Sequence, residues 1–137
     1  MPQFEINNLT VLIAAAVSMV IGFVWYGPLF GKSWAKLMGF TEKKKKEMKR
    51  EAPRMYAMTF VVSLITAYVL AYFVFFTQAL SATDGMMTGF FVWLGFVATT
   101  LFTGVIFGNK PIALYLINAG FQLVSLLTMG AILAVWI

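Results

Sequence analysis

The residues that could do chemistry in this chain are few and mostly uncharged. In the last apolar stretch, Asn118, Gln122 and Ser125 recur at steps of three and four, which places them on one face of a helix. Amides and hydroxyls in this arrangement could hydrogen-bond a small polar solute or hydrate a narrow path. The same side chains could instead join neighbouring helices, with about 0.6–2 kcal/mol for each contact. The sequence leaves both interpretations open.

A second group of hydroxyls lies in the preceding apolar stretch, at Thr99, Thr100 and Thr103. These three threonines are further candidates for a solute path or for helix–helix contacts. A threonine hydroxyl inside a helix can also bond a carbonyl of its own preceding turn. In that case the patch would have no role beyond its own helix.

Several kinds of chemistry lack the residues they need. The chain contains no Cys and no His, so thiolate metal sites, disulfides and the commonest general base are excluded. No Gly-rich phosphate loop, zinc-protease motif or paired-carboxylate motif occurs in the sequence. We therefore predict a protein that is not an enzyme and that holds neither a cofactor nor a metal. The less favoured alternative is an interfacial lipid-modifying enzyme that uses Tyr26, Lys32 or Tyr56.

The elements that must position these residues are apolar helices. Of the 137 residues, 61% are hydrophobic and 11% are charged, against roughly 45–50% and 25% in soluble domains. Four uncharged apolar runs approach or exceed the ~20 residues that cross a ~30 Å hydrocarbon core, where only helices satisfy the backbone locally. We predict an all-α, polytopic membrane protein with a single transmembrane domain over residues 1–137. The four predicted helices cover about residues 8–27, 56–80, 86–107 and 112–137.

The basic residues predict the orientation of these helices. Nine of the ten Lys and Arg residues lie between Lys32 and Arg54, and the tenth is Lys110. Both regions fall on the same side of a four-helix topology, and basic residues in short loops mark the cytoplasmic side. We therefore place the loop of residues 28–55 in the cytoplasm and both termini outside. The membrane expected is the cytoplasmic (inner or plasma) membrane.

The basic loop divides into two predicted helices. Apolar residues between Phe30 and Met38 recur at helical spacing among lysines, which is typical of a short amphipathic helix on a membrane surface. Thr41 is a suitable N-cap for a second helix, which we expect to stop before Pro53, because the residue that precedes a proline disfavours helix. The residues predicted to contact lipid headgroups are Lys32, Lys36, Lys43, Lys44, Lys45 and Lys46.

The lysine run has two interpretations. It could recognise anionic lipid or a partner at the cytoplasmic face. The simpler interpretation is a topology signal on a solvated helix, since basic loops normally mark that face. Nucleic acid is not expected as a partner, because the basic residues lie between two apolar runs.

Small residues recur every fourth position, at Ala14, Ser18 and Gly22 on the first span and at Gly104 and Gly108 on the third. Such stripes allow helix backbones to approach closely, within one bundle or between copies. The leading hypothesis is a non-enzymatic homo-oligomer that encloses a polar permeation path for a small solute or ion. The alternative is an accessory or scaffold membrane subunit whose basic loop binds anionic lipid or a partner.

Several segments in combination resemble a known family. The chain reads WYGPLFGKSW at residues 25–34, WLGF at 93–96, NKP at 109–111, LINAGF at 116–121 and MGAI at 129–132. Together these segments resemble domain-of-unknown-function family 1761, which contains small and mainly bacterial integral membrane proteins. The resemblance implies a stand-alone four-helix protein in a bacterial cytoplasmic membrane. It implies no activity, substrate or catalytic residue, and the long lysine run departs from the family pattern.

Overall fold

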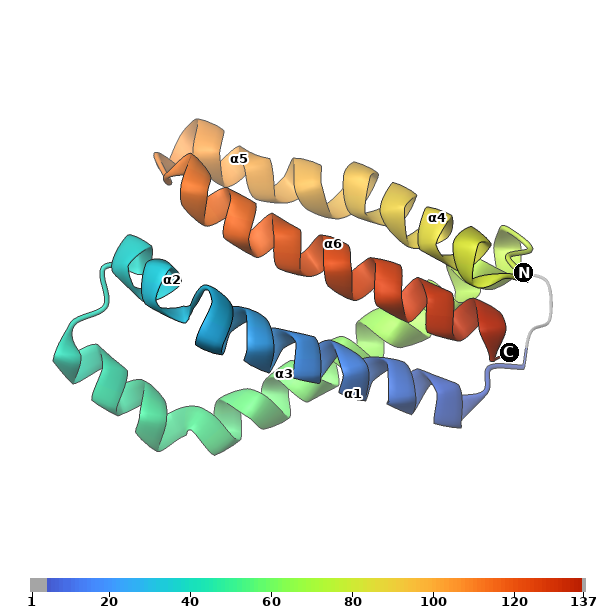
Figure 1. The fold of residues 1–137 in the computed structure, drawn as a ribbon, viewed down its shortest axis with the longest axis horizontal. Coiled ribbons are helices and arrows are strands. Elements are labelled where there is room, and N and C mark those ends of the chain that lie inside the picture. The colour runs from blue at the N-terminus through green and yellow to red at the C-terminus, as the bar shows by residue number, and fades with distance from the viewer. Residues whose placement is uncertain (1–4, 137) are drawn as a thin grey trace.

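The computed structural model describes residues 5–136, and the regular structure over these residues is helical. Figure 1 shows the helices packed lengthwise, with the short helix α2 at the end opposite the C-terminus. The elements in chain order are α1 (Asn8–Val24), the π-helix η1 (Trp25–Leu29), α2 (Gly31–Met38), α3 (Glu42–Phe76), α4 (Ala82–Val92), the π-helix η2 (Trp93–Ala98), α5 (Thr99–Gly108) and α6 (Ile112–Val135).

Four helical spans are long and apolar enough to cross a membrane, as the sequence predicts. They are Asn8–Leu29, Glu42–Phe76, Ala82–Gly108 and Ile112–Val135. The third span begins earlier than the predicted residue 86, because the Ser81 side chain accepts a hydrogen bond from the Asp84 backbone N–H and caps the helix. The predicted end of the fourth span at residue 137 lies outside the described residues.

The observed second span differs from the predicted one at both ends. Helix α3 passes through Pro53 without a break and runs for 35 residues, so the expected stop before this proline is wrong. A proline inside a helix removes one backbone hydrogen bond and kinks the helix without always ending it, and Figure 1 shows α3 bending within its first half. At the other end, α3 stops at Phe76 rather than near Leu80, because Gln78 adopts a left-handed backbone with φ 56°.

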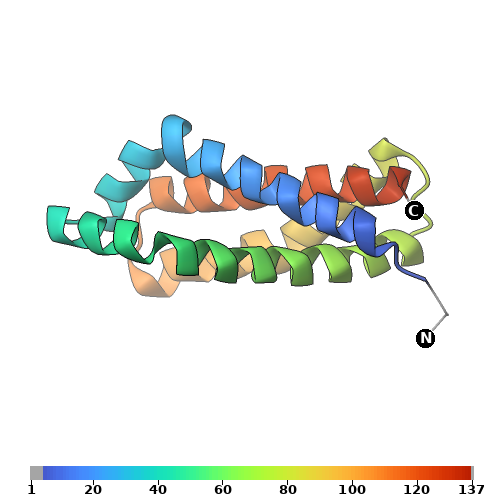
Figure 2. The same cartoon turned by 90° about the horizontal axis from the view of Figure 1, so that it is seen from below.

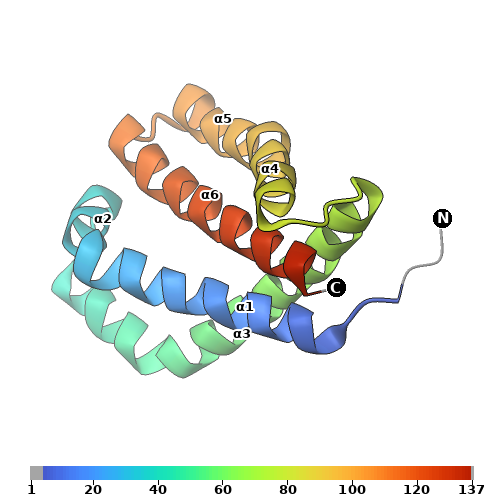
Figure 3. The ribbon, with the colours of Figure 1, turned by 45° about the vertical axis from the view of Figure 1, so that its right-hand side comes forward.

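Helix α6 lies at the centre of the bundle. Helices α1, α3 and α4 all pack on α6, and Figure 3 shows it between α1 and the α4–α5 span. Thr10 bonds Trp136 near one end of the α1–α6 pair and Trp25 bonds Ile117 near the other, so these two helices are antiparallel. The buried face of α6 includes Leu126, Met129 and Leu133. The element that carries the predicted polar face is therefore the element that most other helices contact.

One end of the molecule differs from the other. Figure 2 shows the start of α1 and the end of α6 at one end, with the start of α3 projecting beyond the other helices at the opposite end. Residues 42–55 precede the apolar part of α3 and account for about 20 Å of helix at 1.5 Å per residue. Thr41 caps this extension, as predicted, by accepting a hydrogen bond from the Lys44 backbone N–H at 3.2 Å.

Glycines set the closest helix–helix approach, between α4 and α6. A Cβ placed on Gly85 would meet the backbone carbonyl of Gly130, and one placed on Gly89 would meet the carbonyl of Leu126. Side chains larger than hydrogen would therefore separate the two helices. The predicted Gly104–Gly108 stripe makes no such close helix contact. A Cβ added to either glycine would meet only the Lys110 side chain.

The α4–α6 contact predicts the effect of a single methyl group. In Gly130→Ala the new Cβ meets the Gly85 carbonyl, and we expect a loss of about 1–3 kcal/mol of stability from overpacking. Thermal unfolding in mild detergent would measure this loss as a lower midpoint. Gly95→Ala is the matched control, because a Cβ on Gly95 meets nothing within 4 Å. Equal midpoints for the two variants would contradict the close approach.

Candidate functional site

The polar face of α6 bonds the end of the first span. The Tyr26 hydroxyl donates to Asn118 Oδ1 at 2.7 Å, and the neighbouring Trp25 indole N–H donates to the Ile117 carbonyl at 2.9 Å. Gly120 leaves room for the Trp25 ring, since a Cβ there would lie 3.0 Å from it. The amide at position 118 therefore holds the segment at which the chain leaves its first span.

A second polar contact lies deeper between the same two helices. The hydroxyls of Ser18 and Ser125 are 2.6 Å apart, and both residues are buried. Gln122 lies between Asn118 and Ser125 in the sequence; it is half-buried and has no side-chain hydrogen bond within residues 5–136. Two of the three predicted polar residues of α6 thus bond α1 or η1 of the same chain.

The predicted threonine patch lies apart from this face. Thr99, Thr100 and Thr103 are exposed, and their hydroxyls donate to carbonyls of their own span, those of Gly95, Phe96 and Thr100. Each bond is of the kind that a threonine makes within its own helix. Within one chain the structure does not bring these threonines together with Asn118, Gln122 and Ser125.

Two tryptophans whose contacts the sequence analysis did not predict hold α6 from both sides. Trp25 begins η1 and Trp93 begins η2, and the Trp93 indole N–H donates to the Ala119 carbonyl at 2.9 Å. The signal was present in the sequence as a repeat, Phe-Val-Trp-x-Gly at residues 23–27 and again at 91–95. Its two copies occupy parallel spans on either side of α6 (Figure 3), and π-helical turns of this kind are frequent at functional sites.

The turn after the first tryptophan has a local cause. Pro28 has no N–H, and the Phe30 N–H reaches back five residues to the Trp25 carbonyl at 2.9 Å. Gly31 then begins α2 where no other residue fits, because a Cβ would lie 2.6 Å from the Tyr26 carbonyl oxygen. The Trp34 ring packs edge-on to the Tyr26 ring with centroids 5.2 Å apart. These contacts set the direction of α2.

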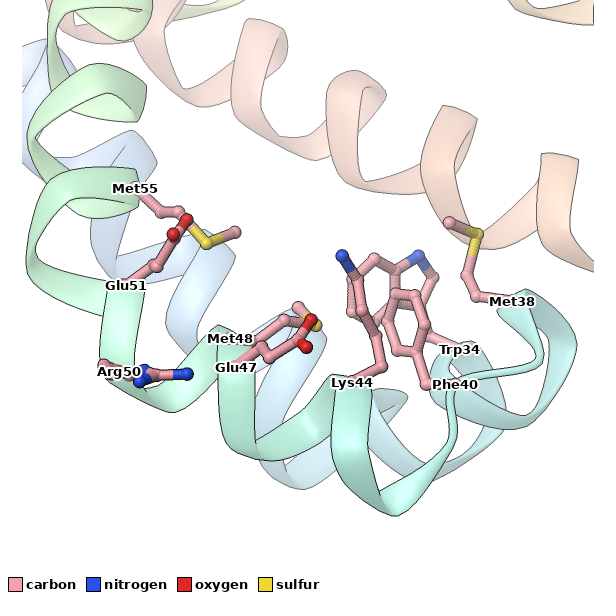
Figure 4. Close-up of a pocket in the computed structure, with 9 residues that line it drawn as sticks. All are labelled: Trp34, Met38, Phe40, Lys44, Glu47, Met48, Arg50, Glu51 and Met55. Atoms are coloured by element: carbon pink, nitrogen blue, oxygen red, sulfur yellow. The ribbon is translucent and has the colours of Figure 1, made fainter.

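A groove opens between α2 and the start of α3. After α2, Gly39 adopts a left-handed backbone with φ 71°, and the chain reverses into α3 three residues later. The groove is open to the outside and has a volume of about 550 Å³. Figure 4 shows the residues that line it. They are Trp34, Met38, Phe40, Lys44, Glu47, Met48, Arg50, Glu51 and Met55.

All six lysines predicted to contact headgroups are exposed, and they lie on α2 and α3, the two helices that form the groove. Lys32 and Lys36 are on α2, and the other four occupy positions 43–46 at the start of α3. Lys44 also lines the groove. Within residues 5–136 the one ion pair is Lys45 Nζ to Glu42 Oε1 at 3.6 Å, so most of the positive charge is free to interact with other molecules.

Comparison with known proteins gives one match. The family model described as a protein of unknown function, DUF1761, matches residues 9–134. No curated protein and no solved structure matches the chain. The matched region contains the groove and all four spans except the first residue of the first span and the last residue of the fourth.

The Tyr26–Asn118 bond predicts a measurable coupling. Tyr26→Phe removes the donor and Asn118→Leu removes the acceptor at similar volume, and we expect a coupling of about 0.6–1.7 kcal/mol in a double-mutant cycle of unfolding in mild detergent. Pairing Tyr26→Phe with Thr100→Val is the control, since the Thr100 hydroxyl bonds its own helix. Additive effects of the first pair would mean that the bond does not hold the first span to α6.

Proposed function

The chain belongs to the DUF1761 family of proteins of unknown function. We propose that it is a non-enzymatic multi-pass membrane protein whose basic segment, residues 28–55, binds anionic lipid headgroups. The observation that carries the proposal is the gathering of exposed, largely unpaired lysines at one end of the helical bundle. A negatively charged leaflet attracts such a cluster with about 1 kcal/mol for each basic residue near its surface. The protein would act as an accessory or scaffold subunit on that leaflet.

The geometry of the segment supports this interpretation. Helix α2 begins directly after the first span and has Trp34 and Leu37 half-buried, whereas Lys32 and Lys36 are exposed. A helix with this sidedness lies along the headgroup layer with its lysines toward phosphate. The lysine run follows at the start of α3, directly after the Gly39 turn that ends α2. By the positive-inside rule this layer is the cytoplasmic leaflet.

The contacts of the polar residues in the bundle favour this function over transport through a single chain. Asn118 and Ser125 are hydrogen-bonded to Tyr26 and Ser18 of the same chain. The Asn118 Oδ1 and Ser125 Oγ atoms are therefore engaged in joining helices of the same chain. The basic segment, by contrast, has charged groups that no other part of residues 5–136 neutralises, apart from Lys45.

Lipid selectivity tests the proposal. In bilayers of mixed composition, we expect spin-labelled phosphatidylglycerol to be enriched over spin-labelled phosphatidylcholine at the protein surface. Replacing Lys43, Lys44, Lys45 and Lys46 by Gln should lower this enrichment at least about threefold, since each residue contributes on the order of 1 kcal/mol before screening. The same four positions changed to Arg keep the charge and should keep the selectivity. Undiminished enrichment in an inserted Gln variant would refute the proposal.

Homo-oligomer formation is a second candidate, favoured by the third span. Only 6% of its apolar window is buried, against 33% for the fourth span. Its exposed residues include Phe91, Ile106 and the three threonines of the predicted path. A second copy of the chain covering this face would bury those residues, and a rotationally symmetric assembly is the usual form. A polar path would then lie between copies rather than within one.

Native mass measurement in mild detergent and in nanodiscs tests the oligomer. We expect a mass above one chain in both media. Ile106→Trp should lower that mass by disturbing the third-span face, whereas Val20→Trp should not, because Val20 is equally exposed (60% against 57%) but lies on α1. A single-chain mass in both media would contradict this candidate.

A further inference from the structure

The three glutamates near the start of α3 differ in whether they line the groove. Glu47 and Glu51 both line the groove, whereas Glu42 lies outside it and pairs with Lys45. Residues four apart share a helix face, and like charges there repel each other. Neither groove carboxylate has an ion pair or a side-chain hydrogen bond within residues 5–136. Two unpaired carboxylates on one helix face can accept hydrogen bonds from a cationic group.

The opposite part of the groove offers hydrogen-bond donors. Lys44 lines it beside Trp34, and Figure 4 shows the two side chains next to each other with their nitrogen atoms directed to the same side. The Trp34 indole N–H has no acceptor within residues 5–136, unlike those of Trp25 and Trp93, which both bond carbonyls of α6. An ammonium and a free indole N–H together suit an anionic oxygen.

The rest of the lining is apolar apart from Arg50, which adds a second basic group to the groove. Met38 comes from α2, and Met48 and Met55 come from α3, on the same face as the two carboxylates. Methionine adapts its shape to flexible apolar ligands. The groove thus brings together two carboxylates, N–H donors and apolar side chains at the end of a membrane span. This combination matches an amphiphile that carries both charges close together.

We propose that the groove binds the headgroup of a membrane phospholipid with a primary ammonium, the phosphoethanolamine type. The ammonium donates to the carboxylates of Glu47 and Glu51, and the phosphate accepts from Lys44 and Trp34. The methionines contact the start of the acyl chains. This proposal rests on the proposed function, because it needs the basic segment to lie at the headgroup layer. It adds a defined site to the general attraction of anionic lipid.

The carboxylates explain why a primary ammonium is preferred. It carries three N–H donors, whereas the trimethylated ammonium of a phosphocholine headgroup has none. The two headgroups have the same net charge, so general attraction to the basic surface does not distinguish them. A preference between the two therefore reports on hydrogen bonding in the groove alone.

The experiment compares spin-labelled phosphatidylethanolamine with spin-labelled phosphatidylcholine at the full-length protein in bilayers. We expect roughly threefold to tenfold enrichment of phosphatidylethanolamine, the range given by one or two added hydrogen bonds. Glu47→Gln together with Glu51→Gln should bring the ratio close to one. Glu42→Gln is the matched control for a lost negative charge on the same helix, and it should leave the ratio unchanged. Trp34→Phe removes a donor to the phosphate that both headgroups share, so it should weaken the binding of both lipids with little effect on the ratio.

The outcomes separate this proposal from the function on which it rests. If the wild-type protein shows no preference for phosphatidylethanolamine, or if the double Gln variant keeps it, the groove site is refuted. Phosphatidylglycerol enrichment measured on the same samples tests the basic surface independently. The double Gln variant should retain or increase that enrichment, because it removes negative charge. Retained phosphatidylglycerol enrichment also shows that the variant is inserted and folded.

Discussion

In a hydrocarbon environment a polar group without a hydrogen-bond partner is costly, and the arrangement of this bundle follows from that constraint. Helix α6 supplies the partners. Its Ile117 and Ala119 carbonyls accept from the two π-helix tryptophans, and its Asn118 side chain accepts from Tyr26. Because these bonds come from two spans on opposite sides, α6 is held at the centre. The other helices are arranged around it.

The same contacts connect the bundle to its basic end. Trp25 and Tyr26 fix the end of the first span on α6, Pro28 produces the π-turn, and Gly31 allows α2 to begin against the Tyr26 carbonyl. Each step limits the direction of the next. The groove between α2 and α3 is therefore a consequence of packing inside the bundle. This connection holds the groove in place on a segment whose composition alone suggests a topology signal on a solvated helix.

Some features of the fold were predictable because their causes are local or compositional. Apolar runs of about twenty residues have few alternatives to spanning helices, and Thr41 caps α3 through a bond to a residue three positions away. The predicted helix end before Pro53 was wrong, because the preference of the preceding residue for a non-helical backbone is weak against the stability of the apolar helix that follows. The role of the tryptophans was also missed. Their partners lie 92 and 26 residues further along the chain, beyond any local signal.

The sequence by itself determined that the chain forms four apolar helices and gathers its basic residues on one side, since hydropathy and charge act without regard to exact contacts. Only the tertiary structure decided what the polar side chains do. Asn118 and Thr100 look alike as polar residues in apolar spans, yet one joins two helices and the other bonds its own. Likewise, three glutamates in one basic segment become one ion-paired residue and two groove carboxylates. Hydrogen bonds and ion pairs depend on distance and direction, and packing sets both.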